Sequence, residues 1–263
     1  MKRFLFVIAC LVMSTGSIAS ADVVFDADTT NTTLSNNDIG SAGTLTGSAG
    51  DLNLQNNGSG FNITALFSTD DINTLNGATL TDLDTVTATI TVSGLSVGVL
   101  RANGIEFGLQ SAIDAPISNN QSGDLVVRAE ASNSGGDIGT FFNGGGFVDS
   151  GEGGATNTGT ITDGFTITLD ADVDGYTFTL ESIGATSPVE ISGAFTGSQF
   201  VDFVGGGRFY YAQQQFNPGN NGVNLLGNIT AASISVETAA IPEPSSLALL
   251  AIGAVGFCVR RRR

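Results

Sequence analysis

The sequence predicts an all-β fold, built as one antiparallel sandwich of two sheets. Apolar and polar residues alternate with a period of two along many short runs, which is the pattern of half-buried strands. Gly, Asn and Asp separate these runs, and the 36 glycines are about twice the usual ~7% share. Helical periodicity is almost absent. Many short strands joined by polar turns are typical of a sandwich or a barrel.

Each expected strand follows from this alternation. The clearest run places Val86, Ala88, Ile90 and Val92 on one face and threonines on the other, so it predicts a strand with a buried face and a hydroxyl face. The same pattern predicts further strands along the chain, at residues 52–54, 61–67, 105–109, 125–129, 165–169, 176–180, 200–204, 209–211 and 234–236.

Residues 22–238 are long enough for a single sandwich domain with a sizeable core. The number of strands, and a first and a last strand near Val23 and Val236 that could pair at one edge, resemble a jelly roll of the concanavalin or laminin-G kind. This resemblance concerns the fold only and implies no site residues.

The N-terminal segment, residues 1–21, predicts a secretory signal peptide. Lys2 and Arg3 precede an apolar run, and the small residues Ala19, Ser20 and Ala21 follow it, so signal peptidase is expected to cut before Asp22.

The C-terminal segment, residues 239–263, contains a Pro-Glu-Pro triplet, an apolar run at 247–259 and a basic end. The run predicts a short single-pass helix, and the basic end stays cytoplasmic because arginines cross a bilayer only at high cost. The order of these parts resembles the PEP-CTERM sorting tail, which implies processing by an exosortase near the triplet. The residues that carry the resemblance are Pro242, Glu243 and Pro244, with Arg260, Arg261, Arg262 and Arg263 as the cytoplasmic stop.

The charge of the domain limits its partners. Between Asp22 and Ile241 lie 24 acidic residues and three arginines, which leaves 21 net negative charges. Nucleic acid and anionic membrane surfaces are excluded by repulsion, so the chain should meet the membrane only through its C-terminal helix. Cys10 and Cys258 both lie in the end segments, so the domain has no disulfide or zinc-thiolate site.

One motif has the spacing of a calcium loop. Asp170, Asp172 and Asp174, followed by Gly175 and then Glu181, match the D-x-D-x-D-G-x5-E pattern, in which several carboxylates close around one ion. The alternative is a β-hairpin, because an Asp-Gly pair between two alternating runs favours a two-residue turn at Asp174 and Gly175. Aspartates on one face of a straight hairpin would be too far apart to share an ion. We therefore expect that the protein requires no cofactor. The alternative is that this loop binds Ca²⁺.

A second candidate site is a sugar-binding strand. Arg208, Tyr210 and Tyr211, followed by Gln213, combine aromatic and polar groups suited to a carbohydrate. The alternative is an ordinary strand whose alternate aromatic side chains enter the core.

Catalysis is restricted by composition. The chain has no histidine, and its domain has neither cysteine nor lysine, which excludes histidine triads, thiol nucleophiles and Schiff bases. Only carboxylate chemistry remains, for example between Glu106 and Glu190 as in a glycosidase. No catalytic residue is assigned, and we expect the protein not to be an enzyme.

These observations predict an exported, acidic protein of the cell surface or extracellular matrix, transiently anchored in the membrane, with a structural or adhesive role. The alternative function is lectin-like binding of exopolysaccharide, assisted by calcium, and the third is a carboxylate glycosidase. The expected partners during export are signal peptidase and exosortase.

Overall fold

The computed structural model describes ten stretches of the chain. The chain divides into two compact units. The larger unit is Ala21–Glu237; the other comprises Met1–Ser20 and Thr238–Arg263. All but the last residue of the predicted signal peptide, and all but the first residue of the predicted sorting segment, lie outside the described residues. These are 21–38, 44–55, 62–96, 103–112, 124–131, 138–142, 148–149, 164–182, 188–215 and 226–239.

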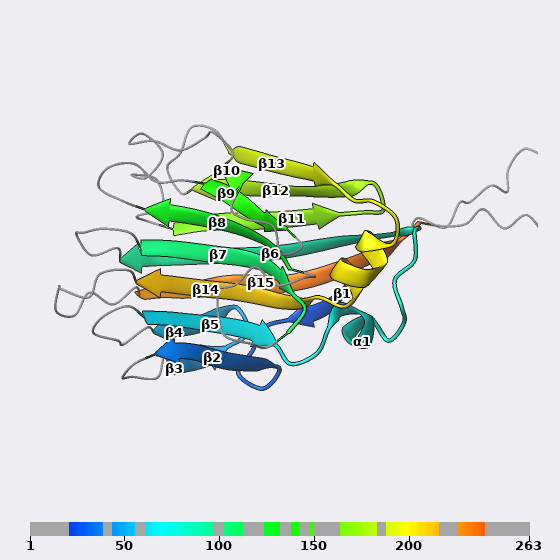
Figure 1. The fold of residues 1–263 in the computed structure, drawn as a ribbon. Coiled ribbons are helices and arrows are strands. Elements are labelled where there is room, and N and C mark those ends of the chain that lie inside the picture. The colour runs from blue at the N-terminus through cyan, green and yellow to red at the C-terminus, as the bar shows by residue number, and fades with distance from the viewer. Residues whose placement is uncertain are drawn as a thin grey trace, which may run out of the picture. The chain divides into compact units, whose positions relative to one another are not determined.

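The larger unit is a sandwich of two antiparallel sheets, as the sequence predicts (Figure 1). Sheet A has the order β13-β12-β11-β6-β15-β4-β3, with β1 paired to β15. Its strands are β1 (Asp22–Asp26), β3 (Thr44–Ser48), β4 (Asp51–Gln55), β6 (Asp84–Ser96), β11 (Gly164–Ala171), β12 (Gly175–Ser182), β13 (Val189–Ala194) and β15 (Leu226–Thr238).

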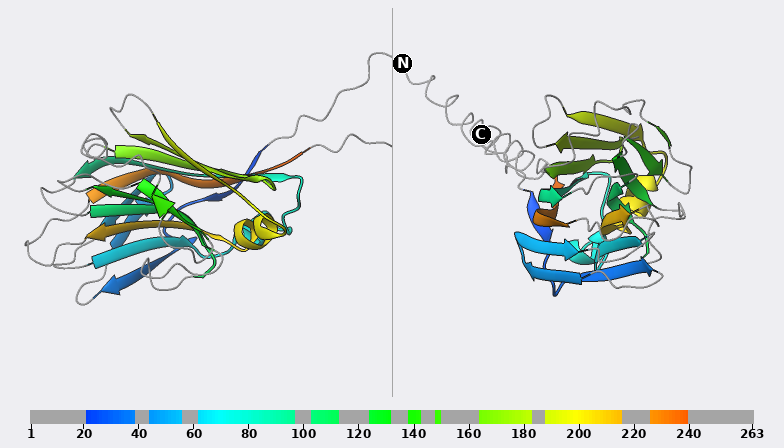
Figure 2. Two further views of the ribbon diagram at one scale, coloured as in Figure 1. Left: turned by 45° about the horizontal axis from the view of Figure 1, so that its top comes forward. Right: turned by 90° about the vertical axis from the view of Figure 1, so that its left-hand side faces the viewer.

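Sheet B has the order β10-β9-β8-β7-β14-β5-β2, and the two sheets face each other in the end-on view of Figure 2. Its strands are β2 (Thr32–Asp38), β5 (Asn62–Ser68), β7 (Asn103–Gln110), β8 (Leu125–Ala131), β9 (Ile138–Phe142), β10 (Val148–Asp149) and β14 (Arg208–Gln215).

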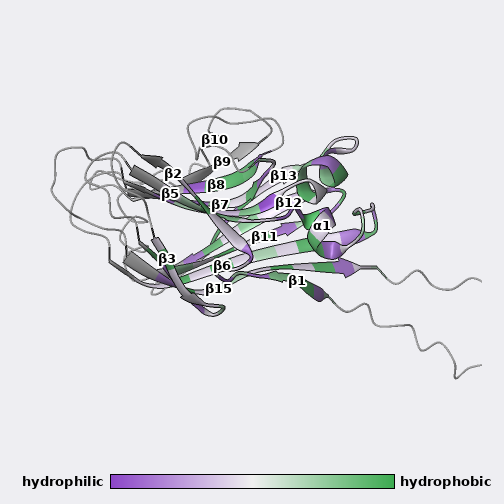
Figure 3. Cartoon of the chain, turned by 90° about the horizontal axis from the view of Figure 1, so that it is seen from below, coloured by the Kyte–Doolittle hydropathy of each residue, from purple (hydrophilic) through white to green (hydrophobic). Residues whose placement is uncertain are grey.

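The main core lies between the sheets, where the alternating apolar residues of both meet (Figure 3). Phe107 of sheet B is fully buried and packs edge-on against Phe178 of sheet A, with ring centroids 6.5 Å apart. Phe107 also contacts Phe209 on the neighbouring strand, at 5.6 Å. Such edge-to-face aromatic pairs stabilise a core beyond the area that they bury.

The first and last strands pair, as predicted. In the register of β1 and β15, Asp22 lies opposite Val236 and Asp26 opposite Ser233. β15 runs through the middle of sheet A, since it also borders β6 and β4. The two ends of the sandwich domain therefore lie side by side.

One predicted strand is wrong. Residues 200–204 form part of a π-helix, η3 (Phe200–Gly205), in which Phe200 and Val204 are buried. A buried pair four residues apart also suits a helix, and five residues with one central aspartate, Asp202, are too few to separate the two periods. A short helix, α1 (Ile72–Asn76), was not predicted; Asp71 caps it by accepting a hydrogen bond from the Thr74 N–H at 2.8 Å.

Among the residues that the structure describes, no helix is long and apolar enough to span a membrane. The helix expected at residues 247–259 lies outside that part of the chain.

Candidate functional site

The predicted hairpin forms between β11 and β12, but its turn lies one residue earlier than predicted. Ala171 pairs with Tyr176, and the Asp172 N–H donates to the Gly175 carbonyl oxygen at 3.0 Å, so Val173 and Asp174 are the central residues. The Asp172 carboxylate explains the shift, because its Oδ1 accepts from the N–H groups of Asp174 (2.9 Å) and Gly175 (3.1 Å). An Asx turn of this kind closes the hairpin.

Gly175 is required by strand packing. Its φ is not positive, but an added Cβ would lie 2.3 Å from the Gly193 carbonyl oxygen on β13. The Asp-Gly pair that indicated a turn thus also marks the close approach of a third strand.

Of the four predicted calcium ligands, Asp170, Asp172 and Asp174 border one pocket, whereas Glu181 lies apart from them. Asp170 lies on the outer face of sheet A and accepts a hydrogen bond from Thr87 Oγ1 at 2.6 Å. Glu181 lies opposite Thr166, six residues beyond Gly175 along a straight strand, which is roughly 20 Å. Within the described ranges no group of three or more His, Cys, Asp or Glu residues could hold a metal ion. The structure therefore does not gather the four residues into one group, because Glu181 lies near the end of β12 that is far from the turn.

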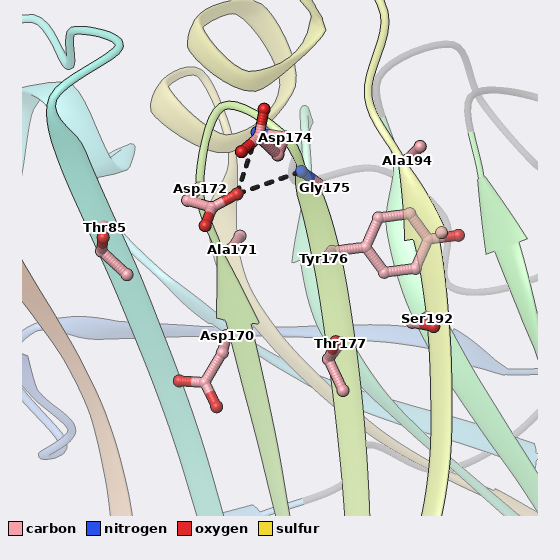
Figure 4. A pocket seen from close by; sticks show the side chains of 11 residues that line it. Thr85, Asp170, Ala171, Asp172, Asp174, Gly175, Tyr176, Thr177, Ser192 and Ala194 are labelled. Carbon is pink, nitrogen blue, oxygen red and sulfur yellow. Dashed lines mark hydrogen bonds between the residues drawn. The ribbon is translucent and has the colours of Figure 1, made fainter.

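The hairpin does border a pocket of about 530 Å³ on sheet A. In Figure 4 the Asp170 and Thr177 side chains lie next to each other on adjacent strands, and the Tyr176 ring extends toward β13. Tyr176 has this space because residue 193 is glycine: a Cβ there would lie 2.5 Å from the Tyr176 hydroxyl oxygen. The lining residues are Thr85, Asp170, Ala171, Asp172, Asp174, Gly175, Tyr176, Thr177, Ser192, Gly193 and Ala194.

The pocket lies at one end of a polar surface that we call the hydroxyl face. It is the outer side of β6, β11, β12 and β13, where Thr and Ser residues and single carboxylates lie opposite one another in rows. One row is Thr87, Asp170, Thr177 and Ser192; the next is Thr89, Thr168, Thr179 and Glu190. Neighbours within a row are about 4.8 Å apart and the rows about 6.8 Å apart, from the geometry of strands.

The predicted sugar-binding tyrosines do not form a shared platform. Tyr210 and Tyr211 are adjacent in β14, so their side chains point to opposite faces of sheet B, and both are 0% exposed. Tyr211 belongs to the main core, where its hydroxyl accepts a hydrogen bond from Gln213 Nε2 at 3.0 Å. Arg208 Nη1 donates to the Ser111 carbonyl oxygen at 3.3 Å. Tyr211 therefore agrees with the alternative prediction of an ordinary strand whose aromatic side chain enters the core.

Tyr210 lies on the outer side of sheet B within a second apolar cluster, which includes Phe67 and Val126. Its hydroxyl donates to Glu106 Oε2 at 3.0 Å, and Arg128 Nε donates to Glu106 Oε1 at 2.6 Å. Glu106 is 2% exposed and the Arg128 side chain 16%. We call Glu106, Arg128 and Tyr210 the buried triad.

The carboxylates proposed for a glycosidase lie far apart. Glu106 is on the outer side of sheet B, whereas Glu190 is exposed on the outer side of sheet A, opposite Thr179. The whole core lies between them, because Val189 and Ile191, next to Glu190, pack against it. A glycosidase needs its two carboxyl groups within about 10 Å, so these two do not form a catalytic pair.

Burial changes the acidity of both tyrosines. Burial raises the pKa of Tyr211, and it raises that of Tyr210 well above the usual value of 10.0, with the Glu106 charge and hydrogen bond adding to the effect. Because a phenolate would be costly in either position, both side chains stay neutral over the physiological range.

The C-terminal residues match a known family model. Residues 240–263 match the PEP-CTERM protein-sorting motif, as the Pro-Glu-Pro triplet and the basic end predict. This motif implies processing by an exosortase, export, and placement at the surface or outside the cell. A search of curated proteins finds no match for the chain.

Solved structures resemble the sandwich at low sequence identity, so they show its fold alone. The CBM2 module of the evolved Dit from Lactobacillus casei BL23 phage J-1 has a TM-score of 0.57 and 14% identity, covering 84% of this chain and 97% of that one. Arcelin-5, a lectin-like defense protein from Phaseolus vulgaris, has a TM-score of 0.53 at 10% identity, over 84% and 99%. Peanut lectin has 0.52 at 10%, over 83% and 97%. The chain thus combines a jelly-roll sandwich of lectin-like fold with a PEP-CTERM sorting motif at its C-terminal end.

Proposed function

We propose that this exported protein belongs to the cell surface or extracellular matrix and binds exopolysaccharide there through its hydroxyl face and the hairpin pocket. The lectin-like fold supports this proposal only by analogy, since fold similarity does not transfer a ligand. The chemistry of the surface carries the argument.

The central observation is the row of Thr87, Asp170, Thr177 and Ser192, of which the last three line the pocket. A hydroxyl both donates and accepts hydrogen bonds, and a carboxylate accepts two or more, so the row matches the hydroxyl groups of a sugar. Because strands repeat these groups at regular distances, an extended polymer can bind several rows at once. The pocket volume of about 530 Å³ lies within the range of small-ligand sites.

Tyr176 supplies the apolar part of the pocket. It is 8% exposed, and its ring packs against Phe178 and Phe195 with centroids 5.9 and 5.5 Å away. A ring held by its neighbours loses little conformational entropy when a ligand binds. Its exposed edge can contact the C–H groups of one sugar while the hydroxyl row binds the polar groups.

Calcium has no role in this proposal. The described carboxylates do not form a group suited to a cation, and one oxygen of Asp172 is used by the turn. Catalysis has no role either, because Glu106 and Glu190 are on opposite outer faces of the sandwich.

The experiment compares binding of the native exopolysaccharide to the mature protein and to the variant Asp170→Ala/Thr177→Ala/Ser192→Ala. Each lost hydrogen bond is worth about 1 kcal/mol, so the dissociation constant should rise by at least ~10-fold. Thr44→Ala/Thr46→Ala is the control, because these threonines are exposed on β3, at the opposite edge of sheet A. A chelator should change nothing.

Equal binding by all three proteins would exclude the hydroxyl face as the site. A wild-type protein that stays in the matrix without binding any glycan would instead support the structural or adhesive role.

A further inference from the structure

Few residues of the sequence separate the sorting motif from the last strand of the sandwich. β15 ends at Thr238, the matched motif begins at residue 240, and Pro242 is only four residues beyond the strand. Four fully extended residues span at most about 14 Å. Even a globular domain of about 100 residues has a radius of gyration of about 13 Å, comparable to this whole distance.

Unwinding the end of β15 would not easily lengthen this connection. β15 borders β6 on one side and pairs with β1 on the other, where Val236 lies opposite Asp22. Ile234 and Val236 are 0% and 4% exposed. Releasing these residues would remove them from the core, so the strand should remain paired to its end.

We propose that this end of the sandwich is a contact surface for the membrane enzyme that processes the sorting segment. The inference rests on processing by an exosortase, which the PEP-CTERM motif implies. An enzyme that encloses the residues around Pro242 must also meet the surface from which β15 emerges. Figure 1 shows the β11–β12 turn, the start of β6 and the end of β15 at this same end.

The chemistry of this surface indicates the kind of partner. Asp22, Asp172, Asp174 and Glu237 are exposed there, and the two arginines of the described chain, Arg128 and Arg208, belong to strands of sheet B. Carboxylates repel anionic lipid headgroups and favour a basic protein surface. The facing part of the enzyme is therefore expected to carry lysine or arginine side chains.

The test is a two-by-two comparison in the source organism with the full-length chain. One change is the charge reversal Asp174→Lys/Glu237→Lys; the other is an insertion of about ten Gly and Ser residues after Ala239, which adds roughly 17 Å of flexible chain. Pulse-chase labelling follows the conversion of the tail-bearing form to the processed form. Glu181→Lys/Glu190→Lys is the control, because it changes the charge equally on strands of sheet A away from this end.

At the native spacing, the charge reversal should slow processing at least about threefold, and the control should not. With the insertion, the reversal should have no effect, because the motif then reaches the enzyme without contact by the domain. Equal rates in all four proteins, faster processing after reversal, or the same slowing with and without the insertion would overturn the contact surface and leave the sorting function intact. A wild-type chain that keeps its tail would overturn both.

Discussion

The outer faces of the two sheets differ in chemistry although both arise from alternating strands. On sheet A, the outer side of β6 and β11 consists largely of threonines, and the residues between them are buried in the core. On sheet B, the outer side contains Phe67, Val126 and Tyr210, all at most 2% exposed. Sheet A thus has one buried face, whereas the described centre of sheet B is buried on both.

This difference explains where charge can be placed. Glu190, on the outer side of sheet A, is exposed and needs no partner. Glu106, on the outer side of sheet B, is buried and accepts hydrogen bonds from Arg128 and Tyr210. A buried carboxylate without such partners would be costly. The sheet A face is therefore free for binding, while the buried triad serves stability.

Arg128→Met should produce the largest effect. It leaves the Glu106 carboxylate buried without its cation, and breaking a buried pair costs about 3–5 kcal/mol. Chemical denaturation of the mature protein measures the loss. The double variant Arg128→Met/Glu106→Gln should recover part of it, because the buried charge is gone.

The matched change on sheet A, Glu190→Gln, should alter the free energy of unfolding by no more than about 0.5 kcal/mol. If Glu190→Gln and Arg128→Met have similar effects, the contrast between the two faces is wrong.

Alkaline pH should unfold the protein through its buried tyrosines. The pKa values of Tyr210 and Tyr211 are raised in the folded state. Above pH ~10 the unfolded chain therefore loses protons that the native state keeps, and stability falls by about 1.4 kcal/mol per pH unit for each tyrosine. The stabilisation is fully present below pH ~10.

Thermal melts of wild type and Tyr211→Phe between pH 8.5 and 11.5 measure this dependence. The variant should have a shallower decline, because one titrating group is removed. The only lysine, Lys2, lies in the predicted signal peptide, so no lysine of the domain interferes. Identical slopes would contradict the role of Tyr211.

Asp172→Ala should destabilise the hairpin by about 1 kcal/mol, since the Asx turn loses the acceptor of two backbone N–H groups. Asp172→Asn keeps an Oδ1 acceptor and should change stability by less than about 0.5 kcal/mol. Thermal melting of wild type and the two variants should rank their stabilities in the same order in calcium, in magnesium and in chelator at matched ionic strength. A calcium-specific gain in wild type alone would contradict the turn role.

Salt should have a small effect, similar in size to that of Asp172→Ala. The domain carries 21 net negative charges, most of the described ones on exposed surface. Raising sodium chloride from 0.01 to 0.1 M shortens the Debye length from ~30 to ~10 Å and should raise the melting temperature by roughly 2–4 °C, or about 1 kcal/mol. A flat or falling melting temperature would show that these charges are too dispersed to matter.

The sequence by itself determined the features that depend on local pattern. Alternation in residues 86–92 and 165–180 predicts the strands and hairpin of sheet A, because one side of these strands meets the core and the other water. The sorting motif at 240–263 was also accessible, since it depends on residues within one short stretch. The pairing of the chain ends near Val23 and Val236 joins distant segments, and it was accessible only through the resemblance of the strand pattern to a jelly roll.

The tertiary structure alone decided which faces are covered and which distant groups meet. Alternation places Tyr210 and Tyr211 on opposite faces, but only packing decides that both faces are buried. The motif spacing of Glu181 suits a loop, but the register of β11 and β12 extends it along a strand. Glu106, Arg128 and Tyr210 come from three strands, so no local pattern predicts their contact. The physical reason is that the two-residue period assigns side chains to a face, whereas the burial of that face depends on segments far away in the chain.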